Sequence, residues 1–283
     1  MLAAVILLFP LPGGAQTPIT LDTVLARLHT YLSDYAERLP ATIASEHYVQ
    51  LAPRAQMPEP RLATIDSDFG IIRLPGVSQW LGFRDVLSKD GKPVSDRQRR
   101  LDSIFQDPSV NALAQARMVA DESARHNIGP IYRTINNPAL VLELLDGRNA
   151  RQMRFKKGGE TTIDRVTAWE IRFSEVGRPT VVSSVNRQDA PSEGRAWIDP
   201  TTGTLLRSEV TVRIPGRTPA GSVKATVKVT FLNDPKLGFW VPSTMTEVYE
   251  TTRAELESGE ATYSNYRMFT VDTRVVINPV PNP

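Results

Sequence analysis

The residues that most often carry enzymatic chemistry are scattered in this sequence. Its three histidines, His29, His47 and His126, stand far apart, and there is no cysteine. A zinc site needs several such ligands at short, regular spacing. The G-x-S-x-G nucleophile motif, the S-x-x-K motif, the phosphate-binding loop and the dinucleotide fingerprint are also absent. The sequence therefore predicts no catalytic residue, no metal ligand and no cofactor.

Two short carboxylate pairs are the nearest approach to an acid–base or metal site. Asp66 and Asp68 flank Ser67, and Glu247 is followed on the same predicted strand by Glu250. Paired carboxylates can act as general acid and base, and several of them can hold calcium. The first pair lacks the glycine and the later ligands of an EF-hand loop, and both spacings are typical of a solvated surface. A hydrolase is therefore the least favoured function, because it would need distant acids that folding brings together.

The basic residues do not form the stripe that nucleic acids require. The formal charge is +2, from 33 Lys and Arg against 31 Asp and Glu. The densest group is Arg97, Arg99 and Arg100, and Lys156-Lys157 falls in a predicted hairpin turn. Neither group is interleaved with aromatic residues, as a nucleic-acid site would be. We expect solvated side chains and no nucleic-acid partner, with contact between the arginines and an anionic membrane surface as the alternative.

The aromatic residues are better candidates for a functional role. There are four Trp and nine Phe, and Trp169, Trp197 and Trp240 all fall in the second half of the chain. Aromatic side chains bury large areas and dominate the packing of sheets. They either belong to an ordinary core or line a cavity, and the choice depends on the elements that carry them.

From residue 151 onward the apolar pattern has a period of two. The clearest run is 222–232, where valine, alanine and phenylalanine at odd positions alternate with lysine and threonine. One apolar and one polar face are typical of an antiparallel sheet that is covered on one side only. On the inward face of such a sheet, if it is curved, we predict a ligand-binding surface of six residues: Trp169, Ile171, Phe173, Val227, Val229 and Phe231.

The first half of the chain shows helical spacing instead. Apolar residues there recur every three or four positions, which predicts amphipathic helices. Four helices are predicted: 20–39, which Pro40 ends; one from Ser95; 109–126; and one with Asn137 as its N-cap and Pro138 in its first turn. Strands are predicted at 43–51, 62–74 and 77–88, with a hairpin turn at Asp90-Gly91.

Together these elements predict an α+β fold. The sheet has an apolar face that needs a cover, and the amphipathic helices need an apolar surface to cover. We therefore expect a curved antiparallel sheet, a half-barrel, with helices mainly from the N-terminal half covering its concave face. The expected organisation is a helix-rich part with a few strands over 16–147 and an antiparallel meander over 148–283, continuous with the first part as one domain.

Residues 1–15 have the pattern of a secretory signal peptide. The apolar run from Leu2 to Leu11 is too short to span a bilayer as a helix, and small residues lead to Ala15, after which cleavage is expected. A buried N-terminal strand is the alternative. No later segment has the roughly 18 apolar residues of a membrane-spanning helix. We expect a mature chain without a transmembrane segment, located in the periplasm or secreted.

The second half also carries a run of motifs found together in one superfamily. They are Trp169-Glu170-Ile171, Trp197-Ile198-Asp199-Pro200 with Thr202-Gly203 and Leu205, the long strand to Phe231, Trp240-Val241-Pro242, and a last strand ending in Tyr266-Arg267-Met268-Phe269. In this region the chain resembles the LolA-like half-barrel superfamily of bacterial periplasmic proteins, which includes lipoprotein carriers and lipid-binding and sensor domains. The resemblance implies a concave sheet able to hold acyl chains. The N-terminal half is similar to uncharacterised secreted bacterial proteins.

These observations favour a non-enzymatic binding or carrier protein, outside the cytoplasm, for a lipid or another hydrophobic ligand. Burial of about 0.8 kcal/mol per CH₂ would hold such a ligand without any covalent chemistry. The alternative is a cell-envelope interaction or sensor module with an envelope protein as partner, in which the chain's own helices fill the concavity. An open apolar cavity would favour the first function, and a cavity filled by Leu140, Leu144 and their neighbours would favour the second.

Overall fold

The protein is described here from a computed structural model. The structure describes residues 18–39, 42–54, 57–72, 80–95, 114, 118, 121–122, 124–133, 135–184, 186–216, 221–252 and 256–268. The predicted signal peptide, the predicted helix beyond Ser95 with its arginine group, and most of the predicted helix at 109–126 lie outside these residues.

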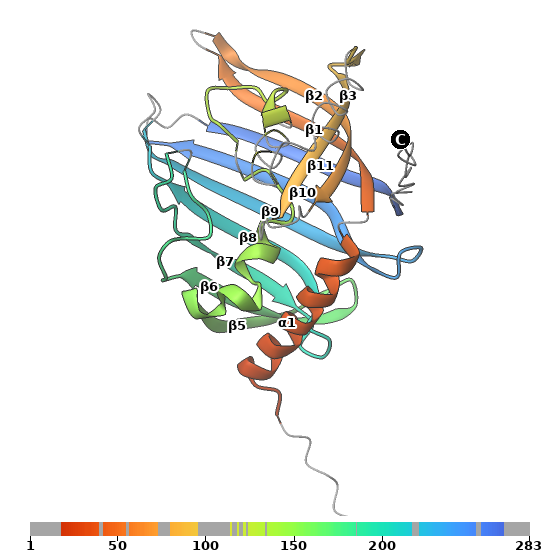
Figure 1. Cartoon of the computed structure of the whole chain (residues 1–283), viewed down its shortest axis with the longest axis vertical. Helices are drawn as coiled ribbons and strands as arrows, with labels where there is room; N and C mark the ends of the chain where they lie inside the picture. Colours follow the sequence, from red (N-terminus) through yellow and green to blue (C-terminus); the bar gives the residue numbers. More distant parts are fainter. Residues whose placement is uncertain are drawn as a thin grey trace, which may run out of the picture.

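Eleven strands form one large, curved and unclosed antiparallel sheet (Figure 1). They are β1 (Thr42–Arg54), β2 (Met57–Ile72), β3 (Leu81–Lys89), β4 (Lys92–Pro93), β5 (Met153–Ile163), β6 (Val166–Glu175), β7 (Ser192–Ile198), β8 (Leu205–Ile214), β9 (Val223–Asp234), β10 (Phe239–Thr251) and β11 (Leu256–Met268). Their order in the sheet is β4-β3-β2-β1-β11-β10-β9-β8-β7-β6-β5. Because β1 pairs with β11, strands from both halves of the chain join in the same sheet.

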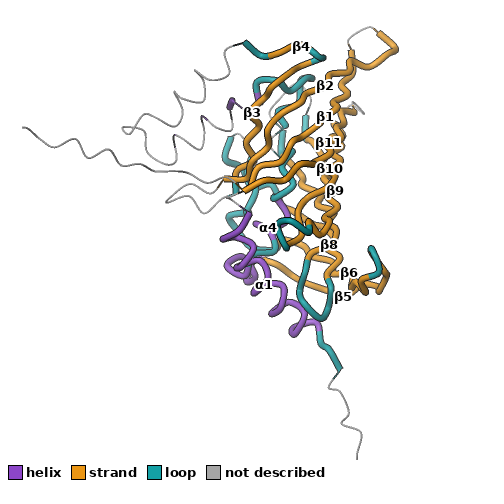
Figure 2. The backbone as a smooth tube through the Cα atoms, turned by 90° about the vertical axis from the view of Figure 1, so that its right-hand side faces the viewer, coloured by secondary structure: helices purple, strands orange, loops and turns teal. Residues whose placement is uncertain are grey.

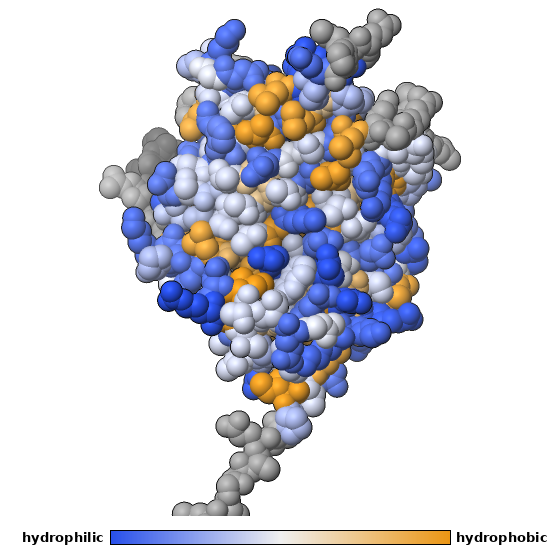
Figure 3. All heavy atoms as spheres, turned by 180° about the vertical axis from the view of Figure 1, so that it is seen from behind, coloured by the Kyte–Doolittle hydropathy of each residue, from blue (hydrophilic) through white to orange (hydrophobic). Residues whose placement is uncertain are grey.

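The predicted alternation is realised along β9. Val223, Val227, Val229 and Phe231 are buried, whereas Lys224 and Lys228 are exposed. The buried set belongs to one apolar core that also contains side chains of α1, and we call the face of the sheet that bears this core the inner face. Hydrophilic residues predominate on the opposite, outer face, which Figure 3 shows. The two faces differ in the way expected of a sheet that is covered on one side.

Helix α1 (Leu21–Arg38) confirms the first predicted helix. The Thr20 side chain accepts a hydrogen bond from the Thr23 N–H at 3.2 Å and so caps the first turn. The stripe of Val24, Leu28 and Leu32 is buried and joins the core of the inner face. Figure 2 shows α1 and α4 on the same side of the sheet. No helix within the described ranges is both long and apolar enough to cross a membrane.

The helix predicted at Asn137 is shorter than expected. Helix α4 spans only Leu140–Leu144, and the 3₁₀-helix η2 (Gly147–Gln152) follows it. The Asn137 side-chain oxygen accepts the Ala139 N–H at 2.9 Å, which makes a turn of 137–139 rather than the first helical turn. Val141 and Leu144 are nonetheless buried in the same core as α1.

Two hairpin turns show where sequence patterns succeed and fail. Asp90 and Gly91 both have positive φ, 51° and 73°, as the predicted turn between β3 and β4 requires. The turn predicted at Lys156-Lys157 is wrong, since both residues lie within β5. The chain turns instead at Asp164 and Arg165, whose φ values are 47° and 69°.

Candidate functional site

The six predicted ligand-binding residues share one place in the fold. Trp169, Ile171 and Phe173 of β6 and Val227, Val229 and Phe231 of β9 all belong to the core of the inner face, and none is more than 7% exposed. Side chains of α1 and α4 belong to the same core. The predicted surface is therefore part of a packed interior here, together with side chains of α1 and α4.

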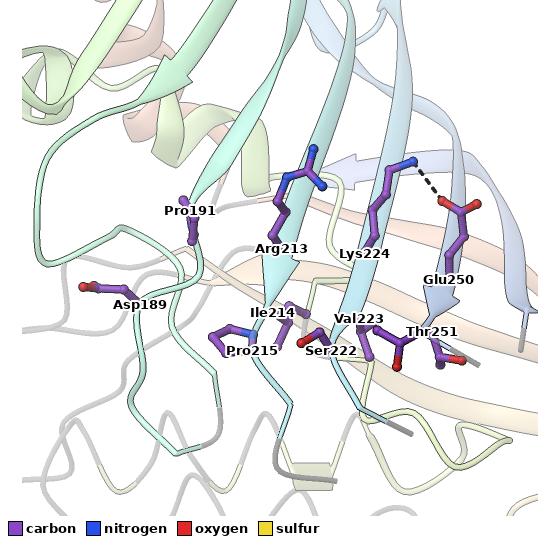
Figure 4. Close-up of a pocket in the computed structure, with 11 residues that line it drawn as sticks. Asp189, Pro191, Arg213, Ile214, Pro215, Ser222, Val223, Lys224, Glu250 and Thr251 are labelled. Atoms are coloured by element: carbon purple, nitrogen blue, oxygen red, sulfur yellow. Dashed lines mark hydrogen bonds and ion pairs between the residues drawn. The ribbon is translucent and has the colours of Figure 1, made fainter. Parts of the chain in front are cut away.

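A pocket lies where this interior meets the surface, at the ends of β8, β9 and β10 (Figure 4). Its volume is about 610 Å³. Its apolar lining includes Val223 and Ile214, of which Val223 belongs to the core and Ile214 packs against it. Pro191 and Pro215 also belong to the apolar part of the lining. We call this feature the mouth pocket, because it adjoins the apolar interior at one end of the sheet.

Val223 of the mouth pocket lies on the same face of β9 as the predicted ligand surface. Val223 and Val227 point to the same face and lie about 13 Å apart along the strand, at roughly 3.3 Å per residue. None of the six predicted residues lines the pocket, and the sequence did not predict it. Its walls come from three strand ends and the loop at Asp189–Pro191, and a local pattern cannot place such segments side by side.

The charged residues at the rim of the mouth pocket are already paired. The Lys224 ammonium lies 2.9 Å from the Glu250 carboxylate, and Arg213 lies 2.9 Å from Glu193. All four side chains are about half exposed or more. Such pairs contribute little binding energy, so the rim offers no strong preference for one charged group.

On the strands near the β4 edge of the sheet, the inner face carries buried charges. Arg84 of β3 binds the Glu46 carboxylate of β1 with two hydrogen bonds, at 2.7 and 3.0 Å, and both side chains are almost fully buried. The Ser67 hydroxyl donates to the same carboxylate at 2.7 Å. The guanidinium also stands over the Tyr48 ring, 4.9 Å from its centroid. This carboxylate is fully engaged in structural contacts.

A second buried group surrounds Arg133. Its Nη1 donates to Glu247 at 2.5 Å, and its Nη2 lies 3.3 Å from Glu257. Tyr48 and Tyr249 both donate hydroxyl hydrogen bonds to Glu247. Burial, followed by the adjacent Glu247, raises the pKa of both tyrosines, so each hydroxyl stays protonated and acts as a donor. Burial also raises the pKa of Glu257, and Arg133 offsets only part of that effect.

The carboxylate pairs of the sequence do not form sites. Asp66 accepts hydrogen bonds from His47 at 2.7 Å and from Ser88 at 2.8 Å, which lower its pKa in that order. Asp68 is paired with Arg267 at 2.8 Å, while Ser67 points to the opposite face. Strand alternation likewise separates Glu247, which is buried inward, from Glu250, which is exposed.

The remaining aromatic candidates have packing roles. Trp197 packs against a separate small core of Ile163, Ala168 and Leu206. The Lys157 ammonium makes a cation–π contact with Trp169 and lies 3.2 Å from the centroid of its ring. Among the described residues there is no group of three or more side chains suited to holding a metal ion.

No family model matches the sequence, and no curated protein matches it. Several solved structures are similar to this chain. The chain is similar to a DUF1329 family protein from Desulfovibrio piger, with 12% identity, 88% of this chain and 92% of that chain covered, and a TM-score of 0.38. It is similar to a LolA superfamily protein from Nitrosomonas europaea, with 11% identity, 90% and 96% covered, and a TM-score of 0.33. It is also similar to lipoprotein LppX from Mycobacterium tuberculosis, with 12% identity, 87% and 96% covered, and a TM-score of 0.25.

A LolA superfamily protein is thus among the similar structures, as the strand motifs predicted. At these identities and TM-scores the likeness identifies no ligand and no partner for this chain. The proposals that follow rest on the geometry of its own residues.

Proposed function

We propose that the protein is a non-enzymatic binding or carrier protein, working outside the cytoplasm, for a lipid or another hydrophobic ligand that enters at the mouth pocket. One observation carries the proposal: a pocket of about 610 Å³ whose lining includes Val223 and Ile214, at one end of the apolar inner face. This volume falls within the range of small-molecule sites, about 300–1,000 Å³. Each CH₂ buried there contributes about 0.8 kcal/mol.

Deeper insertion requires the cover to move. Trp169, Ile171 and Phe173 are fully packed, so an acyl chain reaches them only where α1 or α4 gives way. The proposed site therefore has two parts, the mouth pocket as entrance and the six predicted residues as the lining for the rest of the chain. Because the rim charges are paired, head-group identity and salt should matter little.

Affinity for fatty acids should rise with chain length. With about 0.8 kcal/mol for each added CH₂, Kd falls roughly fourfold per carbon until the site is full. Tryptophan fluorescence titrations with a series of fatty acids, each below its critical micelle concentration and at low and high salt, measure this. An absence of saturable binding, or one Kd for every chain length, would contradict the proposal.

Two matched variants test where the ligand enters. Their affinity for the same fatty acids is measured by calorimetry, because each variant adds a tryptophan that would change the fluorescence. Ser222→Trp places a large side chain at an exposed position that lines the mouth pocket, and it should weaken binding at least tenfold. Ser264→Trp makes the same change at an exposed position of β11 away from the pocket, and it should bind like the wild type. Equal affinities for the two variants would move the ligand elsewhere.

The second candidate function is an interaction or sensor module with a self-filled interior. The observation in its favour is that Val141, Leu142 and Leu144 of α4 are 2% exposed or less against the inner face. A hydrolase has weaker support, because Glu46 and Glu247 are both buried and held by arginines. A flat chain-length series would therefore favour the module.

A further inference from the structure

Arg133 occupies a site that the sheet itself builds. Its side chain is fully buried and reaches from an irregular segment, 127–133, onto the inner face of β10 and β11. It contacts Glu247, Glu257 and the hydroxyl of Tyr48, and its guanidinium lies 5.4 Å from the centroid of the Tyr249 ring. We call these four sheet residues the cradle. Carboxylates with aromatic rings beside them are the groups that recognise guanidinium and ammonium cations.

Hydrogen bonds between sheet residues orient the Glu247 carboxylate of the cradle. Tyr48 of β1 donates to one oxygen of Glu247, and Tyr249 of β10 donates to the other at 2.7 Å. Space for the carboxylate depends on Gly259 of β11, where a Cβ would lie 2.6 Å from the Glu247 Oε1 and 2.7 Å from the Tyr48 ring. A carboxylate oriented in this way by strand residues is preorganised for a cation.

The fit between Arg133 and the cradle is incomplete. Arg133 Nε has no hydrogen-bond partner, and the Oε2 of Glu257 has none with good geometry although Nη2 lies 3.3 Å away. The other contacts of the guanidinium go to backbone carbonyls, Ser258 at 3.1 Å and Leu51 at 3.2 Å. Both groups are buried and keep hydrogen-bonding capacity that the present contacts do not use fully.

The segment that carries Arg133 comes very close to Glu257 of the sheet at Gly129. Gly129 has φ +93°, and a Cβ there would lie 2.3 Å from the Glu257 carboxylate. Glycine therefore allows both the turn and the approach. None of the described residues 127–133 takes part in strand pairing, so the pairing of the sheet does not depend on them.

We infer that the cradle is a binding site for the guanidinium or primary ammonium group of a small molecule, and that Arg133 is its internal occupant. The mouth pocket lies farther along the same strand, β10, and the cradle residues of that strand are buried. Thr251, Tyr249 and Glu247 follow one another on the inner face of β10, and Thr251 lines the pocket. The distance from Thr251 to Glu247 along the strand is about 13 Å. The inference goes beyond the proposed function and does not depend on it, since it concerns a cation rather than an acyl chain.

Chemical rescue tests the inference directly. Arg133→Ala empties the cradle, and methylguanidinium, at concentrations far below those that denature proteins, should raise the Tm of this variant by about 2–4 °C relative to equal NaCl. Tetramethylammonium, which cannot donate hydrogen bonds, should give no such rise. Arg125→Ala, a matched change at a half-exposed arginine paired with Glu122, should show no rescue.

Two results would overturn the inference. One is a folded Arg133→Ala variant whose Tm does not respond to methylguanidinium. The other is an equal response in the Arg133→Ala/Glu247→Gln double variant, because the cradle carboxylate would then have no role. Failure of fatty-acid binding leaves both readouts unchanged.

If Arg133→Ala does not fold, the wild type provides the test. Methylguanidinium competing with Arg133 should accelerate hydrogen exchange of the Ile131 N–H, which donates to Glu257 at 3.1 Å, several-fold. The strand amides of β9 should not respond. Unchanged exchange at Ile131 would overturn the inference.

Discussion

Val229→Asp should lower the free energy of unfolding by about 4 kcal/mol or more. Val229 is 2% exposed and belongs to the core of the inner face. An aspartate at this position buries an unpaired charge or must take up a proton. Since domains are stable by only about 5–15 kcal/mol, urea unfolding should show a variant close to the limit of folding.

The neighbouring position provides the control. Lys228 points to the outer face, where its side chain is 59% exposed and lies 3.5 Å from Glu209. Lys228→Asp removes one weak ion pair, and Glu209 keeps its bond to Arg195 at 2.8 Å. The loss should be under about 1 kcal/mol. Equal losses for the two variants would show that the inner and outer faces have been exchanged.

Arg84→Met should be the second most damaging change, at about 3–5 kcal/mol. It leaves the Glu46 carboxylate buried, with hydrogen bonds to the hydroxyls of Ser67 and Tyr263 but without the guanidinium. The cost comes from the uncompensated charge rather than from lost packing, because methionine fills much of the same space. Urea unfolding at neutral pH measures it.

Two further variants separate charge from packing. Glu46→Gln/Arg84→Met removes both charges and should recover about half of the loss. Arg172→Met breaks an exposed pair, in which Arg172 is 60% exposed and bonded to Glu170 at 2.7 Å, and it should cost under about 1 kcal/mol. A double variant as unstable as Arg84→Met alone would contradict the electrostatic explanation.

The spacing of apolar residues was sufficient to predict those helices and strands that bury one face and expose the other. The spacing of Val24, Leu28 and Leu32 predicted α1 within a residue or two, and the alternation from Val223 to Phe231 predicted the inner face of β9. In both cases the same residues decide the secondary structure and the burial. A shift of one position on β9 would expose every apolar side chain.

Contacts between distant segments could not be predicted in this way. Arg133 meets Glu247 across 114 positions, and Glu46 meets Arg84 across 38. In the sequence Arg133, Glu46 and Arg84 have no spacing signal, and Glu247 stood out only through its short spacing to Glu250, from which strand alternation separates it. The only local hint was a glutamate at an inward position of a strand, as Glu247 is on β10, because burial of such a residue demands a partner.

The mouth pocket was missed for a related reason. Ile214 and Val223 are nine positions apart, and only the β8–β9 pairing places them opposite each other. The loop carrying Asp189 and Pro191 closes the pocket from farther away. A pattern of apolar residues predicts which face of a strand is buried, but the open end of that face depends on where the connecting segments lie.

Native mass spectrometry of the protein, purified without detergent from the cells that naturally produce it, tests the central claim most directly. We predict a second species that carries the added mass of a hydrophobic small molecule, is released by collisional activation, and is depleted in Ser222→Trp but not in Ser264→Trp. A spectrum that contains only the mass of the polypeptide, for the wild type as for both variants, would contradict the carrier function.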